Sequence, residues 1–125
     1  MIDPATLPPC PVETTLSLIT SRWKILIIRD LIDDGPRRFG ELRRSVGNVS
    51  QKVLTQNLRQ MEADGLLTRT AYAEVPPRVE YELTPLGHSL RPIIDALWDW
   101  GERYQAEVRA SFQPMAASRM STKSR

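Results

Sequence analysis

The sequence has 125 residues, of which 41% are hydrophobic and 26% are charged, proportions that fit one small globular domain. No segment approaches the roughly 18 consecutive apolar residues of a membrane span, and the first residues lack the basic and apolar regions of a signal peptide. One cysteine and one histidine exclude an intrachain disulfide and argue against a metal or histidine-based catalytic site. We therefore expect a cytoplasmic protein, not an enzyme, without metal or cofactor.

The net charge of +2 identifies no partner, but the charges are unevenly distributed along the chain. Residues 22–78 carry 11 basic against 7 acidic side chains, whereas residues 79–110 carry 3 against 6. Within residues 35–60 there are 6 basic residues and 1 acidic residue. This pattern predicts one face that binds a polyanion and an acidic segment with another role.

The first half of the chain shows two long helical segments. Cys10-Pro11 begins the first, because proline at the first helical position loses no hydrogen bond. The second extends from Arg22 to about Ile32 after a capping Ser21. It is apolar on nearly all sides and includes Trp23, which predicts a buried central helix.

Two further helices and a turn follow. The third helix is short, with Phe39, Leu42 and Val46 on its inner side. A turn at Gly47-Asn48 leads to a fourth helix, which Ser50 caps and which ends before a left-handed Gly65. The inner stripe of this fourth helix is Leu54, Leu58 and Met61.

After residue 65 the hydrophobic period becomes that of β-strands. Residues 67–72 and 79–83 are the predicted strands, and Val79, Tyr81 and Leu83 alternate to one face. Two prolines between the strands prevent ladder pairing, so a stiff loop joins them. Thr84-Pro85 then begins a last helix that is expected to run to about residue 109 with a kink at Pro92.

The order of these elements predicts a mainly α fold with a small β-hairpin, a winged helix-turn-helix with a long C-terminal helix. We divide the chain into an N-terminal extension, residues 1–9, the winged helix-turn-helix domain, residues 10–110, and a tail expected to be disordered, residues 111–125.

The fourth helix carries polar side chains suited to reading DNA bases on its outer face. Glutamine pairs with adenine, and arginine or lysine pairs with guanine; no acidic residue occurs in this helix before Glu62. Arginines of the preceding segment suit phosphates. A polar face is usually only solvated, but the helix order, basic bias and hairpin together favour DNA binding. The predicted DNA-binding residues here are Arg38, Arg43, Arg44, Ser50, Gln51, Lys52, Thr55, Gln56 and Arg59.

Residues 10–105 closely resemble the HxlR-type winged helix-turn-helix transcriptional regulators of bacteria. The motifs that carry the resemblance are CP, RWKILIIRDL, RRFGELRR, S-x-K-x-L-T-Q-x-L-R-x-M-E-x-D-G-L, VPPRVEYELTPLG and the closing WG. The resemblance implies a homodimer without enzyme activity, in which the first and last helices form much of the interface. It also implies double-stranded operator DNA with two half-sites, expected as an inverted repeat, and regulation of a neighbouring gene in response to a chemical signal. We expect repression, by occlusion of the polymerase, although activation is equally compatible with these residues.

Apolar residues repeat every seven positions in the last helix, which is typical of a helix–helix interface. This seam agrees with dimerisation. The alternative is that the helix merely docks on its own domain, but the seam has more apolar surface than one helix-turn-helix can cover. The predicted dimerisation residues, including two from the first helix, are Val12, Leu16, Leu90, Ile93, Ile94, Leu97, Trp98, Trp100 and Tyr104.

Arg78 follows two prolines near the predicted wing tip, where it suits a minor groove or a phosphate. The alternative is a surface arginine beside Glu74 or Glu80.

Cys10 lies where the positive end of a helix dipole stabilises a thiolate. Some members of the resembled family sense quinones, aldehydes or oxidants through a cysteine at the matching place. Redox or electrophile sensing at Cys10 would require a link between the two subunits or an adduct. The alternatives are a half-buried structural cysteine and a small-molecule effector bound near Trp98 and Trp100.

The alternative function is a winged-helix protein-interaction module without sequence-specific DNA binding, whose last helix recruits a partner. That function predicts a weak basic bias on the fourth helix, which the charge count disfavours.

Overall fold

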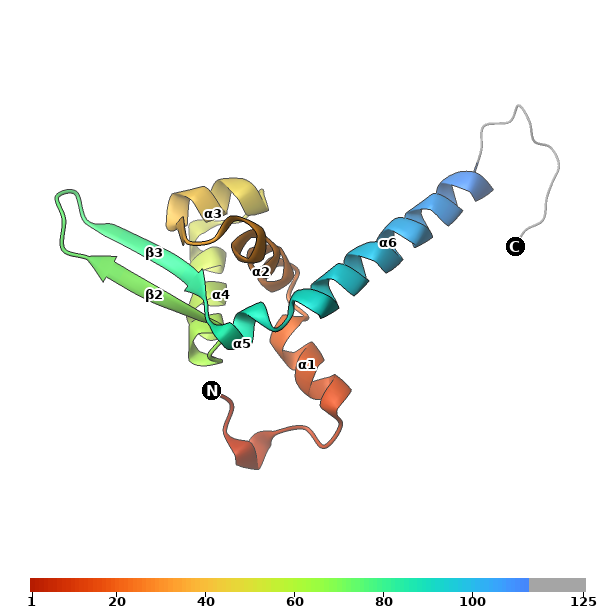
Figure 1. Ribbon diagram of the computed structural model, residues 1–125, viewed down its shortest axis with the longest axis horizontal. Coiled ribbons are helices and arrows are strands. Elements are labelled where there is room, and N and C mark those ends of the chain that lie inside the picture. The colour runs from red at the N-terminus through yellow and green to blue at the C-terminus, as the bar shows by residue number, and fades with distance from the viewer. Residues whose placement is uncertain (113–125) are drawn as a thin grey trace. The chain divides into compact units, whose positions relative to one another are not determined.

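The computed structural model describes residues 1–112, which divide into one unit, Met1–Arg91, and a second that begins at Pro92. The elements of the first unit, in chain order, are the 3-10 helix η1 (Pro4–Thr6), α1 (Pro11–Ile19), α2 (Arg22–Asp34), β1 (Arg37–Arg38), α3 (Phe39–Val46), α4 (Gln51–Ala63), β2 (Leu67–Tyr72), β3 (Arg78–Leu83) and α5 (Pro85–His88) (Figure 1). The helix α6 (Arg91–Ser111) begins at the boundary and forms the described part of the second unit. No described helix is both long and apolar enough to cross a membrane.

Helix α2 is the buried centre of the first unit, as predicted. Ile27 and Ile28 have no exposed surface, and α2 contacts α3, α4 and β3. The other fully buried side chains are Leu31, Leu42, Leu54, Leu58, Met61, Leu66 and Leu67. Trp23 is half-buried rather than central, and the Arg22 guanidinium lies 5.0 Å from the centre of its ring.

Helices α3 and α4 form the predicted helix-turn-helix pair. The Arg38 backbone N–H donates to Glu41 Oε1 at 2.8 Å and fixes the first turn of α3. The Ser50 hydroxyl accepts the Val53 N–H at 3.1 Å, which confirms the predicted cap of α4. Gly65, with φ 81°, follows α4 in the left-handed conformation that favours glycine.

Ser21 does not cap α2 with its side chain, which corrects the prediction. Ser21 is the residue before α2, but its side chain makes no capping hydrogen bond there. Its hydroxyl donates a hydrogen bond to Asn57 of α4 instead.

The sheet is antiparallel with strand order β1-β3-β2. The predicted hairpin is confirmed, with Leu67 opposite Leu83 and Arg69 opposite Tyr81. The sequence did not predict β1, in which Arg37 pairs with Tyr81, because two residues are too short for an alternating pattern.

The predicted single kinked helix after residue 84 is wrong, since two helices occupy this segment. The N–H groups of Ser89 and Leu90 donate hydrogen bonds to carbonyl oxygens of α5, and these bonds end the helix. In a continuous helix Pro92 would lack the N–H that bonds the carbonyl of His88, and its ring would clash there. In the first turn of α6 that N–H is not required.

Helix α5 is locked onto the end of α4. The Thr84 hydroxyl donates to the Gly65 carbonyl oxygen at 2.7 Å and accepts the Gly87 N–H at 3.0 Å, which confirms Thr84 as the helix cap. A Cβ at Gly87 would lie 2.2 Å from the Leu66 carbonyl oxygen, so only glycine permits this close approach. These contacts fix the base of the hairpin beside α4.

The described part of the second unit is α6 alone. The rings of Trp100 and Tyr104, one turn apart, stack with centroids 5.5 Å apart. The helix ends at Ser111, the first residue of the predicted tail. The predicted disorder of residues 113–125 lies outside the described residues.

Candidate nucleic-acid interface

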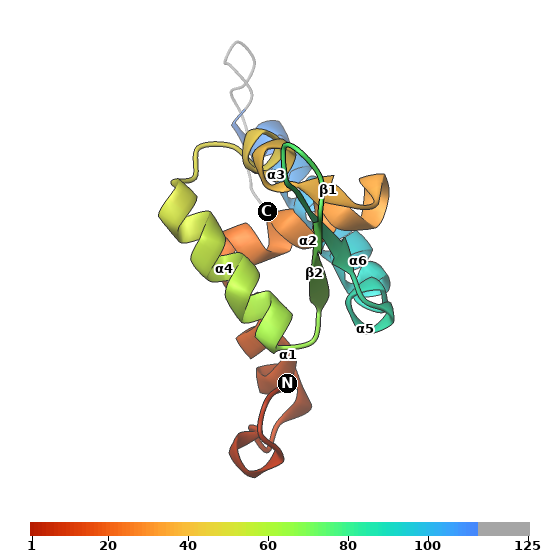
Figure 2. The same cartoon turned by 90° about the vertical axis from the view of Figure 1, so that its left-hand side faces the viewer.

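Helix α4 turns one face to the core and the other to solvent. Leu54, Leu58 and Met61 are buried, and the helical period therefore places the intervening polar residues outward. Figure 2 shows α4 at the left-hand edge of the first unit. Ser50, Gln51, Lys52, Gln56 and Arg59 are exposed, and Thr55 is half-buried. A shallow hollow is lined by Gln51, Lys52, Thr55, Gln56 and Arg59. The structure thus brings the predicted base-reading side chains together on one face.

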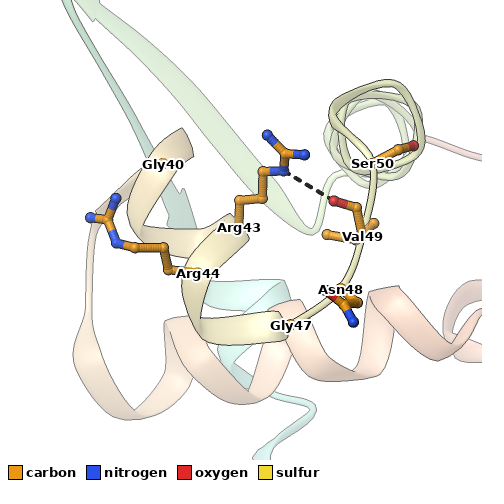
Figure 3. Close-up of a pocket in the computed structure, with 7 residues that line it drawn as sticks. All are labelled: Gly40, Arg43, Arg44, Gly47, Asn48, Val49 and Ser50. Atoms are coloured by element: carbon orange, nitrogen blue, oxygen red, sulfur yellow. Dashed lines mark hydrogen bonds between the residues drawn. The ribbon is translucent and has the colours of Figure 1, made fainter.

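The turn between α3 and α4 holds a second basic cluster. A hollow there is lined by Gly40, Arg43, Arg44, Gly47, Asn48, Val49 and Ser50 (Figure 3). Arg43 Nε donates to the Val49 carbonyl oxygen at 3.0 Å, so this side chain anchors the turn that begins α4. Arg44 extends to the other side of α3, toward Gly40 (Figure 3). The Arg43 guanidinium beside the N-terminus of α4 suits a phosphate, and Arg44 adds positive charge on the other side of α3.

The two arginines of β1 have different surroundings. Arg37 Nη2 lies 2.7 Å from Asp34 Oδ2, so a carboxylate already offsets its charge. Arg38, the predicted phosphate ligand of this pair, is exposed.

Arg78 is held within the wing by three neighbours. Its Nη2 lies 2.8 Å from Glu74 Oε2, its Nη1 lies 2.9 Å from Glu80 Oε2, and the guanidinium carbon lies 3.9 Å from the centre of the Tyr72 ring. The hydrogen bond to Glu74 is the main cause that raises the pKa of Arg78 above its ordinary value. This arrangement corresponds to the alternative drawn from the sequence, a surface arginine paired with glutamates, and DNA contact by Arg78 stays a prediction.

A basic residue that sequence reasoning did not select is Arg69 of β2. It lines a hollow between α4 and the hairpin, together with Arg59. The alternation of side chains along a strand could have identified it, because Arg69 is two residues from Leu67 and therefore lies on the same face of the hairpin.

Cys10 is exposed at the N-terminus of α1. Its carbonyl oxygen accepts the Thr14 N–H at 3.1 Å, and Pro11 is the first helical residue, as predicted. The exposed thiol differs from the half-buried structural cysteine considered as an alternative. Among residues 1–112, no group of three or more His, Cys, Asp or Glu side chains is placed to hold a metal ion.

Large apolar side chains are exposed on α1 and on α6. Their exposed fractions range from 38% for Ile93 to 64% for Val12. The exposed members of the predicted dimerisation set are Val12, Leu16, Ile93, Leu97, Trp98, Trp100 and Tyr104. Leu90 and Ile94 are only 8% and 7% exposed within one chain, which leaves little of their surface for a partner, and their part in dimerisation stays a prediction.

Comparisons with known proteins agree with this geometry. The model of the HxlR-like helix-turn-helix family matches residues 18–109. The uncharacterized HTH-type transcriptional regulator YdeP of Bacillus subtilis (strain 168) is 46% identical over 99 residues, which cover 79% of this chain and 77% of YdeP.

Three solved structures of two other proteins are also similar to this chain. The redox regulator HypR in its reduced form is 42% identical, with a TM-score of 0.75, over 81% of this chain and 99% of that chain. Its oxidized form is 46% identical, with a TM-score of 0.70, over 75% and 96% of the two chains. Diamide-treated YodB from B. subtilis is 33% identical, with a TM-score of 0.63, over 76% and 94%. By sequence and by its winged helix-turn-helix fold, the chain belongs to the HxlR-like helix-turn-helix family.

Proposed function

We propose that this protein is a homodimeric, sequence-specific DNA-binding transcriptional regulator that represses genes by occupying their operators. The observation that carries the proposal is the outer face of α4, which has no carboxylate before Glu62 and displays Gln51, Lys52, Gln56 and Arg59 to solvent. Phosphates repel carboxylates, so such a face is suited to a DNA groove. The relatives named as transcriptional regulators support the proposal.

In this proposal the N-terminal half of α4 enters the major groove. Glutamine amides pair with adenine, and Lys52 and Arg59 pair with guanine. Arg38, Arg43 and Arg44 bind phosphates on the flanking backbone, which supplies affinity but no base preference. The hydrogen bond from Arg43 to Val49 holds the turn, so α4 meets the groove at a fixed angle.

A second copy of the chain covers the exposed apolar residues of α1 and α6. Exposed aromatic and aliphatic side chains of this size favour aggregation unless a partner buries them. The stacked pair of Trp100 and Tyr104 provides a rigid aromatic anchor. The two α4 helices of the dimer then bind half-sites whose centres are about 34–36 Å apart.

A thiol-reactive signal enters this regulator at Cys10. The thiols of the two subunits join as a disulfide, while an azo compound such as diamide accepts the two electrons and two protons that are released. The exposure of Cys10 supports this step, as do the oxidized and reduced structures of HypR and the diamide-treated structure of YodB.

Fluorescence anisotropy with duplexes from the DNA upstream of the protein's own gene tests DNA binding. We expect one fragment to bind about 10³-fold more tightly than a shuffled duplex, with an affinity that falls linearly on a logarithmic salt scale. Equal, salt-insensitive affinity for all duplexes would contradict the proposal and favour the protein-interaction module.

A further inference from the structure

A hollow lies between α4 and the wing hairpin, which is formed by β2 and β3. It measures about 430 Å³ and is lined by Thr55, Leu58, Arg59, Glu62, Arg69 and Tyr81. The residues from α4 form one wall, and Arg69 of β2 and Tyr81 of β3 form the other. Leu58 and Tyr81 are buried, whereas Arg59, Glu62 and Arg69 are exposed.

The strand register explains why Arg69 faces this hollow. Leu67 is opposite Leu83, and two residues further along Arg69 is opposite Tyr81. Alternate residues of a strand share a face, so Arg69 continues the face on which Leu67 packs into the core. The Leu67 side chain is 1% exposed, so the hairpin packs against the protein interior at this residue. Arg69 itself is exposed, whereas Tyr81 opposite it remains buried.

Arg59 and Arg69 differ from Arg78 in their ion pairing. Arg78 has two carboxylate partners within 3 Å. Neither Arg59 nor Arg69 forms an ion pair with any residue in the described part of the chain. Glu62 lines the same hollow without pairing to either arginine. Two uncompensated guanidinium groups on facing walls attract an anion.

The hollow continues the predicted base-reading surface. Thr55 and Arg59 line it, and they also line the shallow hollow along the outer face of α4. A polyanion lying on α4 therefore passes directly over Arg59 toward Arg69. In a duplex whose major groove holds α4, the chain of phosphates that borders the groove is the part that reaches this point.

We infer that Arg69 is a phosphate-binding residue that holds the DNA backbone between α4 and the wing. This inference rests on the proposed function and adds a residue to it. Arg59, the proposed guanine-reading residue, lies on the other wall and adds its positive charge, so the backbone that borders the groove passes between helix and hairpin. Arg69 fixes the position of the duplex and reads no base. The Glu62 carboxylate weakens DNA binding, because it repels the phosphates.

Anisotropy titrations of Arg69→Gln, with the wild-type operator fragment over a range of salt concentrations, test this role. The slope of log affinity against log salt should fall by about 0.9 per protomer, and affinity at about 0.15 M salt should fall about fivefold per protomer. Arg69→Lys keeps the charge and should restore the slope. Base preference should be unchanged in both variants.

Two further variants complete the design. Arg109→Gln, in the last turn of α6, removes the same charge outside the first unit and should leave the slope unchanged. Glu62→Gln should strengthen binding about twofold. If Arg69→Gln binds like the wild type with the same slope, the inference fails while the proposed function stands. If the wild type itself does not distinguish operator from shuffled duplex, the proposed function fails first.

Discussion

The Ser21 hydroxyl donates a hydrogen bond to Asn57 Oδ1 at 2.9 Å. Asn57 Nδ2 in turn donates to the Val53 carbonyl oxygen at 2.8 Å, one turn earlier in α4. Asn57 thus ties α4 to the junction between α1 and α2 through its amide oxygen, while its amide nitrogen bonds within α4 and fixes the side chain. Cys10 precedes the N-terminus of α1 and Ser21 follows its C-terminus, so this contact connects the far end of the helix that bears the proposed signal site to the proposed DNA-reading helix.

Replacement of Ser21 by alanine should lower the free energy of unfolding by about 1 kcal/mol, because the partly buried Asn57 oxygen loses its donor. Urea denaturation measures the change. Ser45→Ala is the control, since Ser45 is exposed and should change stability by less than about 0.5 kcal/mol. Equal losses in the two variants would show that the Ser21 bond contributes nothing specific.

Arg59 and Arg44 should differ in what they contribute to DNA binding. Arg59→Ala should weaken operator binding by about 1–3 kcal/mol and relax the preference at one base pair, because a bidentate guanine contact is lost. Arg44→Ala should weaken binding to all duplexes alike and lower the salt slope by about 0.9 per protomer. Competition titrations with single-base operator variants separate these outcomes. Loss of base preference in Arg44→Ala would refute the assignment.

Replacement of Arg78 by glutamine should loosen the wing. Glu74 and Glu80 lose the guanidinium that holds them, and two uncompensated carboxylates then remain beside the loop. Hydrogen exchange of the amides of residues 73–75 should become faster, and operator affinity should fall. Arg69→Gln is the matched control for exchange, because Arg69 belongs to the same hairpin but forms no ion pair among the described residues. Unchanged exchange in Arg78→Gln would mean that the clamp does not order the loop.

Diamide should change the affinity of the wild type for its operator by about 5- to 150-fold, the range typical of coupling between two sites. A linked dimer should appear on a non-reducing gel and disappear on addition of dithiothreitol. Cys10→Ser removes the only cysteine of the chain and should abolish both effects. If Cys10→Ser responds to diamide as the wild type does, Cys10 is not the sensor.

Local patterns predicted most of the fold. The inner stripe of α4, its Ser50 cap and its terminal Gly65 lie within one continuous segment, and each acts through neighbours a few residues away. The hairpin was predicted for the same reason. Strand β1 was not, because its pairing with Tyr81 is a long-range contact and its two residues carry no period. The break between α5 and α6 was not predicted, because Pro92 is compatible both with a kink within one helix and with the first turn of a new helix.

The sequence predicted the part of the candidate site that lies on the single helix α4. It did not predict the parts that depend on contacts between two elements. The α4 residues share one face because of helical geometry alone. Arg69 reaches the same surface only through the strand register and the packing of the hairpin beside α4. The clamp on Arg78 likewise depends on a loop conformation that brings Glu74 and Glu80 to the same guanidinium.

Selection from random duplexes, followed by sequencing of the bound fraction, tests sequence-specific binding by a dimer most directly. The wild type should enrich an inverted repeat with half-site centres about 10–10.5 base pairs, or a multiple of this, apart. Leu97→Glu, which places a charge at an exposed apolar position of α6, should sediment as a monomer and enrich at most a single half-site. Arg109→Glu, in the same helix, should behave as the wild type. Enrichment of no sequence by the wild type would contradict the account.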